Sequence, residues 1–266
     1  MAKVVTDTKH YTDIANVLRT HLGTNAKFKP QEMASEVDMV HTHGYNRGYM
    51  GGRSAEYDAF WDAYQDYGNR RNYVTGFAGG GWTADTFKPK YNIIPQNNSN
   101  TMFQSSAING NLKDILTQCG VVLDLSNVTR FQYGFSSTKF TGLGVINLSK
   151  ADSRTTYVFY DSSSLVSIEK LIVSESNATF ANWFDGCTAL TDITIEGSIS
   201  RSIDIHWSTG LTMSSLASIV GALSKTVTGQ TITLPTTAKN TYDNATYPGR
   251  WDELVAEYPN WTFAYA

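Results

Sequence analysis

Hydrophobic residues recur at helical spacing over residues 1–75 of this chain. Between Tyr11 and Leu22 apolar side chains lie three or four positions apart, and Gly23 ends the pattern. A second amphipathic stretch carries a wide aromatic face, formed by Tyr57, Phe60, Trp61, Tyr64 and Tyr67. Such a face must pack on something, because a lone helix would leave it in water. We therefore predict that residues 1–75 form a helical segment for attachment and oligomerisation.

The pattern changes near residue 76, where short apolar stretches begin to alternate with segments rich in Ser, Thr, Asn and Gly. Equivalent apolar positions recur at one constant interval in two series: Phe140, Leu165 and Leu190, then Leu143, Ile168 and Ile193. Each unit ends in an apolar-x-apolar pair and begins with a phenylalanine, at Phe135, Phe159 or Phe184. Weaker copies surround Phe103 and Ile203. This repeat predicts one short strand per unit.

Units of this length bury their apolar rows only by stacking on one another. We therefore predict an α+β fold in which a leucine-rich-repeat solenoid with one short parallel strand per repeat spans residues 76–210. Its phenylalanines should pack between units, and Leu165, Ile168 and Leu190 should be fully buried. Residues 211–266 should form an α/β cap, because the end of a solenoid must be covered. The expected elements of this cap are a helix with Thr212 as N-cap, a strand at Thr231–Leu234, a helix at Trp251–Tyr258 and a strand over 261–265.

Composition and charge limit the classes of partner. The chain has 21 basic and 24 acidic residues and a net charge of -3, which predicts no nucleic-acid surface. The polar start predicts that no signal peptide is present, and no run approaches the ~18 apolar residues of a membrane span. We therefore expect synthesis in a cytoplasm and no membrane span. Cys119 and Cys187 lack metal-ligand spacing and are expected to be buried, reduced thiols.

No motif predicts catalysis. The glycine-rich stretch 76–82 lacks the Gly-Lys-Ser/Thr ending of a phosphate-binding loop, and Gly-x-Ser-x-Gly is absent. The carboxylates of the repeats fall at expected solvent-facing positions rather than in a glycosidase pair. His41 and His43 could offer six imidazoles around the axis of a trimer, although a solvated helix end is the preferred interpretation. We therefore predict no enzyme activity, no cofactor and no metal.

The repeat units resemble the BspA-type leucine-rich repeat, which reads roughly F-x-x-C-x-x-L-x-x-I-x-[IL]. One unit matches this pattern at every position, through Phe184, Cys187, Leu190, Ile193 and Ile195. The other units keep the leucines and replace the cysteine with Ser or Thr. The resemblance implies a leucine-rich-repeat fold.

The N-terminal segment resembles a different set of proteins. Tyr11 to Gly23 followed by Phe28 to Ala34 is similar to an "IA-x-IR-x-K-x-G … P-x-E-M-A" segment. That segment heads many tail and fibre proteins of bacteriophages that infect gut-type Gram-positive bacteria, and residues 56–91 look like the linker to the repeats in the same proteins. The resemblance implies a virion protein of the tail or baseplate, made in the host cytoplasm.

Three functions are compatible with these features. The first is a tail fibre or baseplate adhesin, whose residues 1–75 dock to other virion proteins and whose repeats bind a host surface glycan or protein. A homo-oligomer is expected, and analogy with phage fibres suggests a trimer. The second is a purely structural virion connector or decoration protein. The third, a tail enzyme that degrades cell wall, is disfavoured because no catalytic constellation is visible.

The candidate binding surface is the outward face of the predicted strands. The residues that alternate with buried ones there form a weakly charged surface rich in Ser, Thr and Asn: Asn147, Ser149, Ile172, Ser174, Thr194 and Glu196. Trp183, His206 and Trp207 are the nearest aromatic candidates for a stacking contact beside this face. Tyr157 and Tyr160 also lie off the repeat positions. Packing beneath loops is the preferred interpretation for such aromatics, and a platform for sugars or proteins is the alternative.

Overall fold

The computed structural model describes residues 77–79, 82–85, 87–89, 92–95, 97–152, 154–177, 179–243 and 249–266. The chain divides into two units, Met1–Arg71 and Asn72–Ala266, and all described residues belong to the second. The predicted N-terminal helices and the pair His41 and His43 lie outside these residues.

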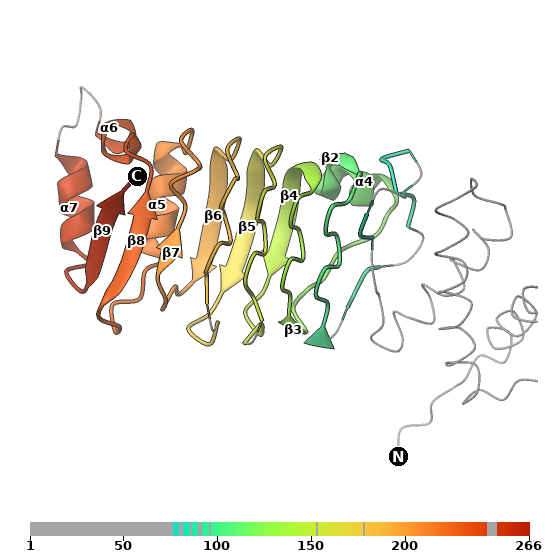
Figure 1. Cartoon of the computed structure of the whole chain (residues 1–266), viewed down its shortest axis with the longest axis horizontal. Helices are drawn as coiled ribbons and strands as arrows, with labels where there is room; N and C mark the ends of the chain where they lie inside the picture. The colour runs from blue at the N-terminus through green and yellow to red at the C-terminus, as the bar shows by residue number, and fades with distance from the viewer. Residues whose placement is uncertain are drawn as a thin grey trace, which may run out of the picture. The chain divides into compact units, whose positions relative to one another are not determined.

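Short parallel strands form three sheets (Figure 1). A four-stranded sheet contains, in this order, β2 (Asn109–Asn111), β4 (Lys139–Asn147), β5 (Ser167–Val173) and β6 (Asp192–Gly197). A three-stranded sheet contains β7 (Ile203–Asp204), β8 (Gln230–Leu234) and β9 (Trp261–Tyr265), and a further pair joins β1 (Asn97–Asn98) to β3 (Val128–Arg130). Every pairing among the described strands is parallel. We predicted an α+β fold with short parallel strands, and the structure confirms the short parallel strands within a mixed α/β architecture.

The register of the central strands matches the spacing of the apolar positions. Leu143 of β4 lies opposite Ile168 of β5, and Ile168 lies opposite Ile193 of β6, so the partners are the residues that the sequence repeat makes equivalent. Equivalent apolar side chains therefore meet across the strands. Leu165, Ile168 and Leu190 are at most 1% exposed, so their predicted burial is confirmed.

Five phenylalanine rings form a continuous stack beside the central sheet. Consecutive ring centroids lie 5.2 to 5.8 Å apart and the rings are tilted by only 5° to 23°, through Phe77, Phe103, Phe135, Phe159 and Phe184. All five side chains are fully buried. Offset stacks of this kind stabilise a core beyond the area that they bury. The sequence predicted core positions for the last three rings, and Phe77 was not predicted.

Hydrogen bonds join the turns that carry these rings. The backbone N–H groups of Phe103 and Phe135 donate to the carbonyls of Gly134 and Val158, at 2.7 and 2.8 Å. The side chain three positions after a ring adds a second link. Ser162 Oγ donates to Phe135 O at 2.6 Å, and Cys187 Sγ donates to Phe159 O at 3.1 Å. In these two units the small polar residue at this position therefore satisfies a buried carbonyl.

Helix α4 (Leu112–Gln118) lengthens one unit. Asn111 caps it, because its side-chain oxygen accepts hydrogen bonds from the N–H groups of Lys113 and Asp114. The interval along the chain from Phe103 to Phe135 is longer than the intervals between the later rings. The seven residues of α4 account for this difference. The sequence analysis did not predict this helix.

Helix α5 (Met213–Gly221) ends the four-stranded sheet. Thr212 caps it by accepting a hydrogen bond from the N–H of Ser215, which confirms the predicted N-cap. The hydroxyls of Ser215 and Ser218 then accept hydrogen bonds from the β6 N–H groups of Ile193 and Ile195, at 2.9 and 2.7 Å. The helix therefore satisfies a strand edge that would otherwise expose unpaired backbone groups.

The C-terminal residues add two more helices, α6 (Ala238–Tyr242) and α7 (Arg250–Ala256). Strands β8 and β9 and helix α7 occupy the predicted positions, whereas α6 was not predicted. Trp251 of α7 is buried, and its Nε1 donates a hydrogen bond to the Tyr265 hydroxyl at 2.8 Å. Among the described residues, none of the helices combines the length and apolar character that a membrane crossing requires.

The buried leucine row gives a direct test of the packing. We expect Leu165→Ala to lower the free energy of unfolding by roughly 2–5 kcal/mol, because it removes a buried side chain and leaves a cavity. For a unit of this size the melting temperature should fall by about 2–4 °C per kcal/mol. The matched control is Val166→Ala, since this neighbouring side chain is 41% exposed. Equal melting temperatures of the two variants, measured by circular dichroism, would contradict the packing.

Candidate functional site

The outward face of the central sheet gathers four of the predicted binding residues. Asn147 lies opposite Ile172, and Ile172 lies opposite Glu196, so these three residues form one row across β4, β5 and β6. Thr194 and Glu196 are exposed, while Asn147 and Ile172 are half-buried. We call Asn147, Ile172, Thr194 and Glu196 the sheet face.

Ser174 lies just beyond the end of β5, where it helps to hold a turn. Its hydroxyl donates to Ser149 O at 2.6 Å, and its N–H donates to Asn177 Oδ1 at 2.7 Å. The amide nitrogen of fully buried Asn177 donates in turn to the carbonyls of Leu148 and Ala151. Ser174 and Ser149 therefore join neighbouring turns to each other.

The charges beside the sheet face are paired with each other. Lys170 Nζ lies 2.7 Å from Glu196 Oε2, and Lys113 Nζ lies 2.8 Å from Glu169 Oε2. The hydrogen bond to Glu196 raises the pKa of Lys170, and the hydrogen bond to Glu169 raises the pKa of Lys113. These pairs are about half exposed, so they contribute little to stability. Their effect is to leave the surface close to electrically neutral.

A hollow of about 310 Å³ adjoins this surface, between α4 and β4. Leu116, Val122 and Val145 line it, together with the Lys113–Glu169 pair. Val122 and Val145 are 55% and 47% exposed, which is unusual for large apolar side chains. Sequence reasoning missed this feature because it depends on α4.

Trp183 is fully buried, contrary to its expected place beside the binding surface. Its ring centroid lies 4.7 Å from that of Phe180 and 6.1 Å from that of Phe159. The ring is part of the core and cannot stack on a ligand at the surface in this structure. Among the described side chains, its Nε1 is a buried donor that forms no hydrogen bond.

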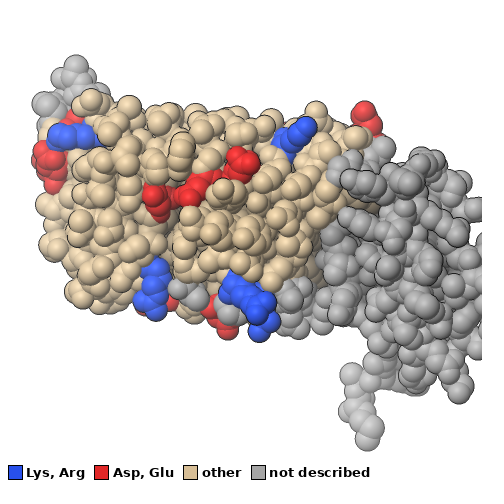
Figure 2. All heavy atoms as spheres, viewed as in Figure 1, with Lys and Arg blue, Asp and Glu red and all other residues tan. Residues whose placement is uncertain are grey.

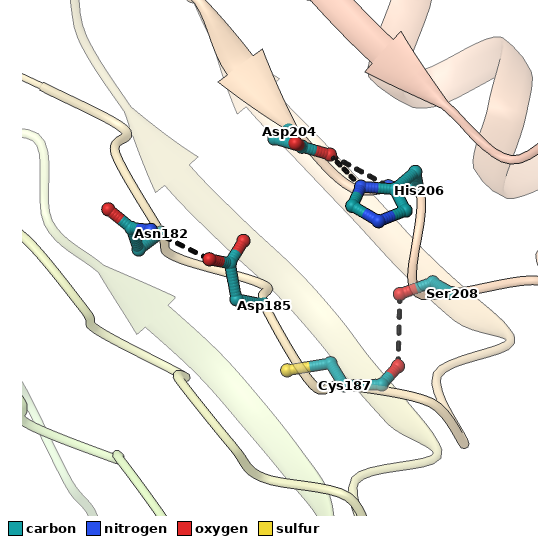
Figure 3. A network of polar contacts seen from close by, with 6 residues as sticks. All are labelled: Asn182, Asp185, Cys187, Asp204, His206 and Ser208. Carbon is teal, nitrogen blue, oxygen red and sulfur yellow. Dashed lines mark hydrogen bonds and ion pairs between the residues drawn. The ribbon is translucent and has the colours of Figure 1, made fainter. Parts of the chain in front are cut away.

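His206 and Trp207 follow β7, which belongs to the three-stranded sheet and not to the sheet of β4, β5 and β6. Asp204 Oδ1 lies 2.6 Å from His206 Nδ1 (Figure 3). The ring centroids of His206 and Trp207 are 4.9 Å apart. Trp207 is 46% exposed. The structure therefore divides the predicted site between two separate sheets.

A second polar surface lies on the turns that carry the phenylalanine rings. We call its six residues the turn face: Tyr133, Tyr157, Tyr160, Asp161, Asn182 and Asp185. The rings of Tyr133 and Tyr157 stack at 4.9 Å with a tilt of 6°, and Tyr160 meets Tyr157 edge-on at 5.3 Å. Asn182 Nδ2 donates to Asp185 Oδ2 at 2.7 Å (Figure 3). Sequence reasoning noted Tyr157 and Tyr160 but preferred packing beneath loops for them.

The three turns of this surface share one backbone shape. Each contains two residues with positive φ, four positions apart: Tyr133 and Ser137, Tyr157 and Asp161, and Asn182 and Gly186. Residues other than glycine rarely adopt this conformation, so its recurrence marks equivalent turns. Backbone hydrogen bonds join them, from Tyr157 N to Ala181 O at 3.2 Å and from Asp161 N to Asp185 O at 2.7 Å.

Metal-ligating side chains do not gather in the described part of the chain. No group of three or more His, Cys, Asp or Glu residues is placed there to hold a metal ion. Cys187 is buried, as expected, whereas Cys119 is half-buried. Burial raises the pKa of the Cys187 thiol to about 12, so this group is neutral at physiological pH.

Comparison with known proteins identifies no relative: no protein-family model matches this sequence, and no curated protein or solved structure is significantly similar to it.

The placement of Trp183 yields a test with two variants. We expect Trp183→Ala to cost about 3–5 kcal/mol of stability, because it empties a large buried volume. Trp183→Phe keeps an aromatic ring and removes the unpaired N–H, so it should cost far less. Urea denaturation measures both free energies. Equal, small effects of the two substitutions would show that this side chain is not in the core.

Proposed function

We propose that residues 76–210 form a BspA-like leucine-rich-repeat solenoid and that residues 211–266 form its cap. The register of β4, β5 and β6 supports this proposal, because it repeats the spacing of the sequence units. The stack of equivalent phenylalanines supports it as well. Helix α5 and the strands β8 and β9 would then be the cover that the end of a solenoid requires.

We further propose that the protein is a non-enzymatic bacteriophage virion protein, a tail fibre or baseplate adhesin that binds the host cell surface. In this proposal residues 1–75 attach to other virion proteins and the solenoid displays a binding surface. The observation that carries it is the parallel sheet, whose outward residues are mostly polar and nearly neutral in net charge. Such a surface suits hydrogen bonds to a glycan or to the loops of a protein.

A structural connector is the second candidate, and the paired charges favour it. Within each of the pairs Lys113–Glu169 and Lys170–Glu196, the positive and negative charges neutralise each other. This lowers the desolvation free energy that is lost when another virion protein covers the surface permanently. The two candidates differ in whether the sheet face remains accessible in the assembled particle.

Adsorption of particles to host cells tests the adhesin function. We expect Thr194→Arg to reduce adsorption by at least tenfold, because it places a long cation in the middle of the sheet face. Thr228→Arg adds the same charge at another exposed threonine and is the matched control. Normal assembly with normal adsorption of both variants would remove the sheet face as receptor site. Failure of Thr194→Arg particles to assemble would favour the connector.

A shortened chain tests the role assigned to residues 1–75. We expect a chain that begins at residue 75 to keep its parallel sheet, because Phe77, the first ring of the stack, is retained. It should lose self-association and incorporation into particles. Light scattering measures the oligomeric state, circular dichroism the sheet content, and blotting of purified particles the incorporation. Unchanged assembly of the shortened chain would contradict this assignment.

A further inference from the structure

We propose that the turn face is a glycan-binding surface, and that it takes a neutral, hydroxyl-rich polysaccharide whose sugar rings follow one another from turn to turn. The proposal rests on the adhesin function and adds the class of ligand and a second surface. Its starting point is an ordered row of tyrosines and carboxylates on three equivalent turns, a feature that the sheet face does not have.

The spacing of the turns suits a chain of sugars. Tyr133 and Tyr157 repeat at a centroid distance of 4.9 Å, and Asp161 is hydrogen-bonded through its backbone N–H to the next turn at Asp185. Hydrogen-bonded neighbours of this kind advance by about 4.8 Å. One hexose of an extended polysaccharide advances by a similar length. Successive sugars can therefore lie over successive turns, where they meet different side chains, since Tyr160 of one turn is equivalent to Asp185 of the next.

The side chains offer the two contacts that sugars use. Tyr160 is 38% exposed and offers apolar ring area for the C–H face of a pyranose ring, whereas Tyr133 and Tyr157 cover one face of each other by stacking. The carboxylates of Asp161 and Asp185 accept hydrogen bonds from hydroxyl groups, and charged acceptors form the stronger ones. The ion pairs found within the described residues involve neither of these carboxylates.

A glycine lets two turns of this surface approach each other closely. Gly186 occupies the position next to Asp161 in the neighbouring turn, with φ of +76°. A Cβ atom there would lie 3.1 Å from Asp161 Cα and 3.3 Å from Asp161 Oδ1, which is tighter than ordinary contact. The glycine therefore helps to keep Asp161 close to the neighbouring turn.

The surface is also held in place before any ligand arrives. Asn182 donates to Asp185 at 2.7 Å, and the stacked pair Tyr133 and Tyr157 fixes the position of Tyr160. Less conformational freedom is therefore lost on binding. Figure 2 shows a short line of acidic side chains on the visible face with no basic side chain in it. Asp161 and Asp185 give the turn face negative charge, which disfavours anionic polymers and leaves a neutral glycan as the expected ligand.

Native gel electrophoresis of the full chain tests the proposal. The gels contain one soluble polymer each: dextran, mannan, a mixed-linkage β-glucan or glycol chitin, with polyglutamate as the anionic comparison and polylysine as the cationic one. We expect at least one of the neutral or acetylated sugar polymers to slow the chain, and polyglutamate to leave its mobility unchanged. Tyr160→Ala and Asp161→Asn should each weaken the retardation at least fivefold. Asparagine tolerates the positive φ of Asp161, so this variant should fold normally.

Glu253→Gln, at an exposed residue of α7 that belongs to neither face, removes the same charge as Asp161→Asn and is the control, which should bind sugar polymers like the parent. The proposal is overturned if no sugar polymer slows the chain, or if the turn-face variants bind as the parent does. Capture of polylysine alone, lost at high salt, would instead indicate a cationic protein partner and would also overturn it. Host adsorption that depends on Thr194 but not on Tyr160 would reject this inference while the adhesin function stands.

Discussion

The stacked phenylalanines are the contact on which the rest of the described structure depends. Each inner ring of the stack lies between the rings of two other turns, so no turn completes its own core. The position of one turn fixes the position of the next, and the backbone hydrogen bonds between turns become possible only at that separation. The sheet of β2, β4, β5 and β6 is the second result of this stacking, because its strands follow the turns at the same intervals.

A parallel sheet of this kind has two edges with unpaired backbone groups, and at one edge side chains form hydrogen bonds with those groups. Helix α5 cannot offer β6 a strand, but its serines stand one helical turn apart and reach two alternate amides of the strand. Serine suits this role because its hydroxyl accepts a hydrogen bond while the side chain remains short enough for close packing. The sheet thus stops at a helix without leaving those amides unpaired.

The sequence predicted the features that follow from a regular period. Leu165 and Ile168 were identified as core because equivalent apolar residues recur at a constant interval on either side of them, and Thr212 was identified because capping is a local property. Prediction from the sequence failed where the regular period of the repeats breaks. Helix α4 is an insertion within a weak copy, and Phe77 stands before the recognisable units.

The aromatic binding candidates were misplaced because the repeat spacing carries no information about the features that position them. Asn182 has positive φ, which redirects the chain, so that Trp183 and Phe184 both point inward and the alternation rule no longer holds. His206 and Trp207 follow a strand that pairs with another sheet, and strand pairing is a long-range property. The predicted outward residues that lie within the strands were placed correctly, because their direction follows from their buried neighbours. Ser149 and Ser174 were not, since they lie beyond the ends of β4 and β5.

The hydroxyl contacts between α5 and β6 have a consequence for how such a chain can change length. They involve only the last strand and the helix that follows it. On the strand they bind backbone groups rather than particular side chains. Under the proposed repeat architecture, the same helix can therefore terminate an array with more or fewer units. Duplication or loss of the segment between Phe159 and Phe184 would leave α5 and its contacts with the last strand unchanged. Variation in the number of units would then alter the length of the displayed surface without requiring a new end for the sheet.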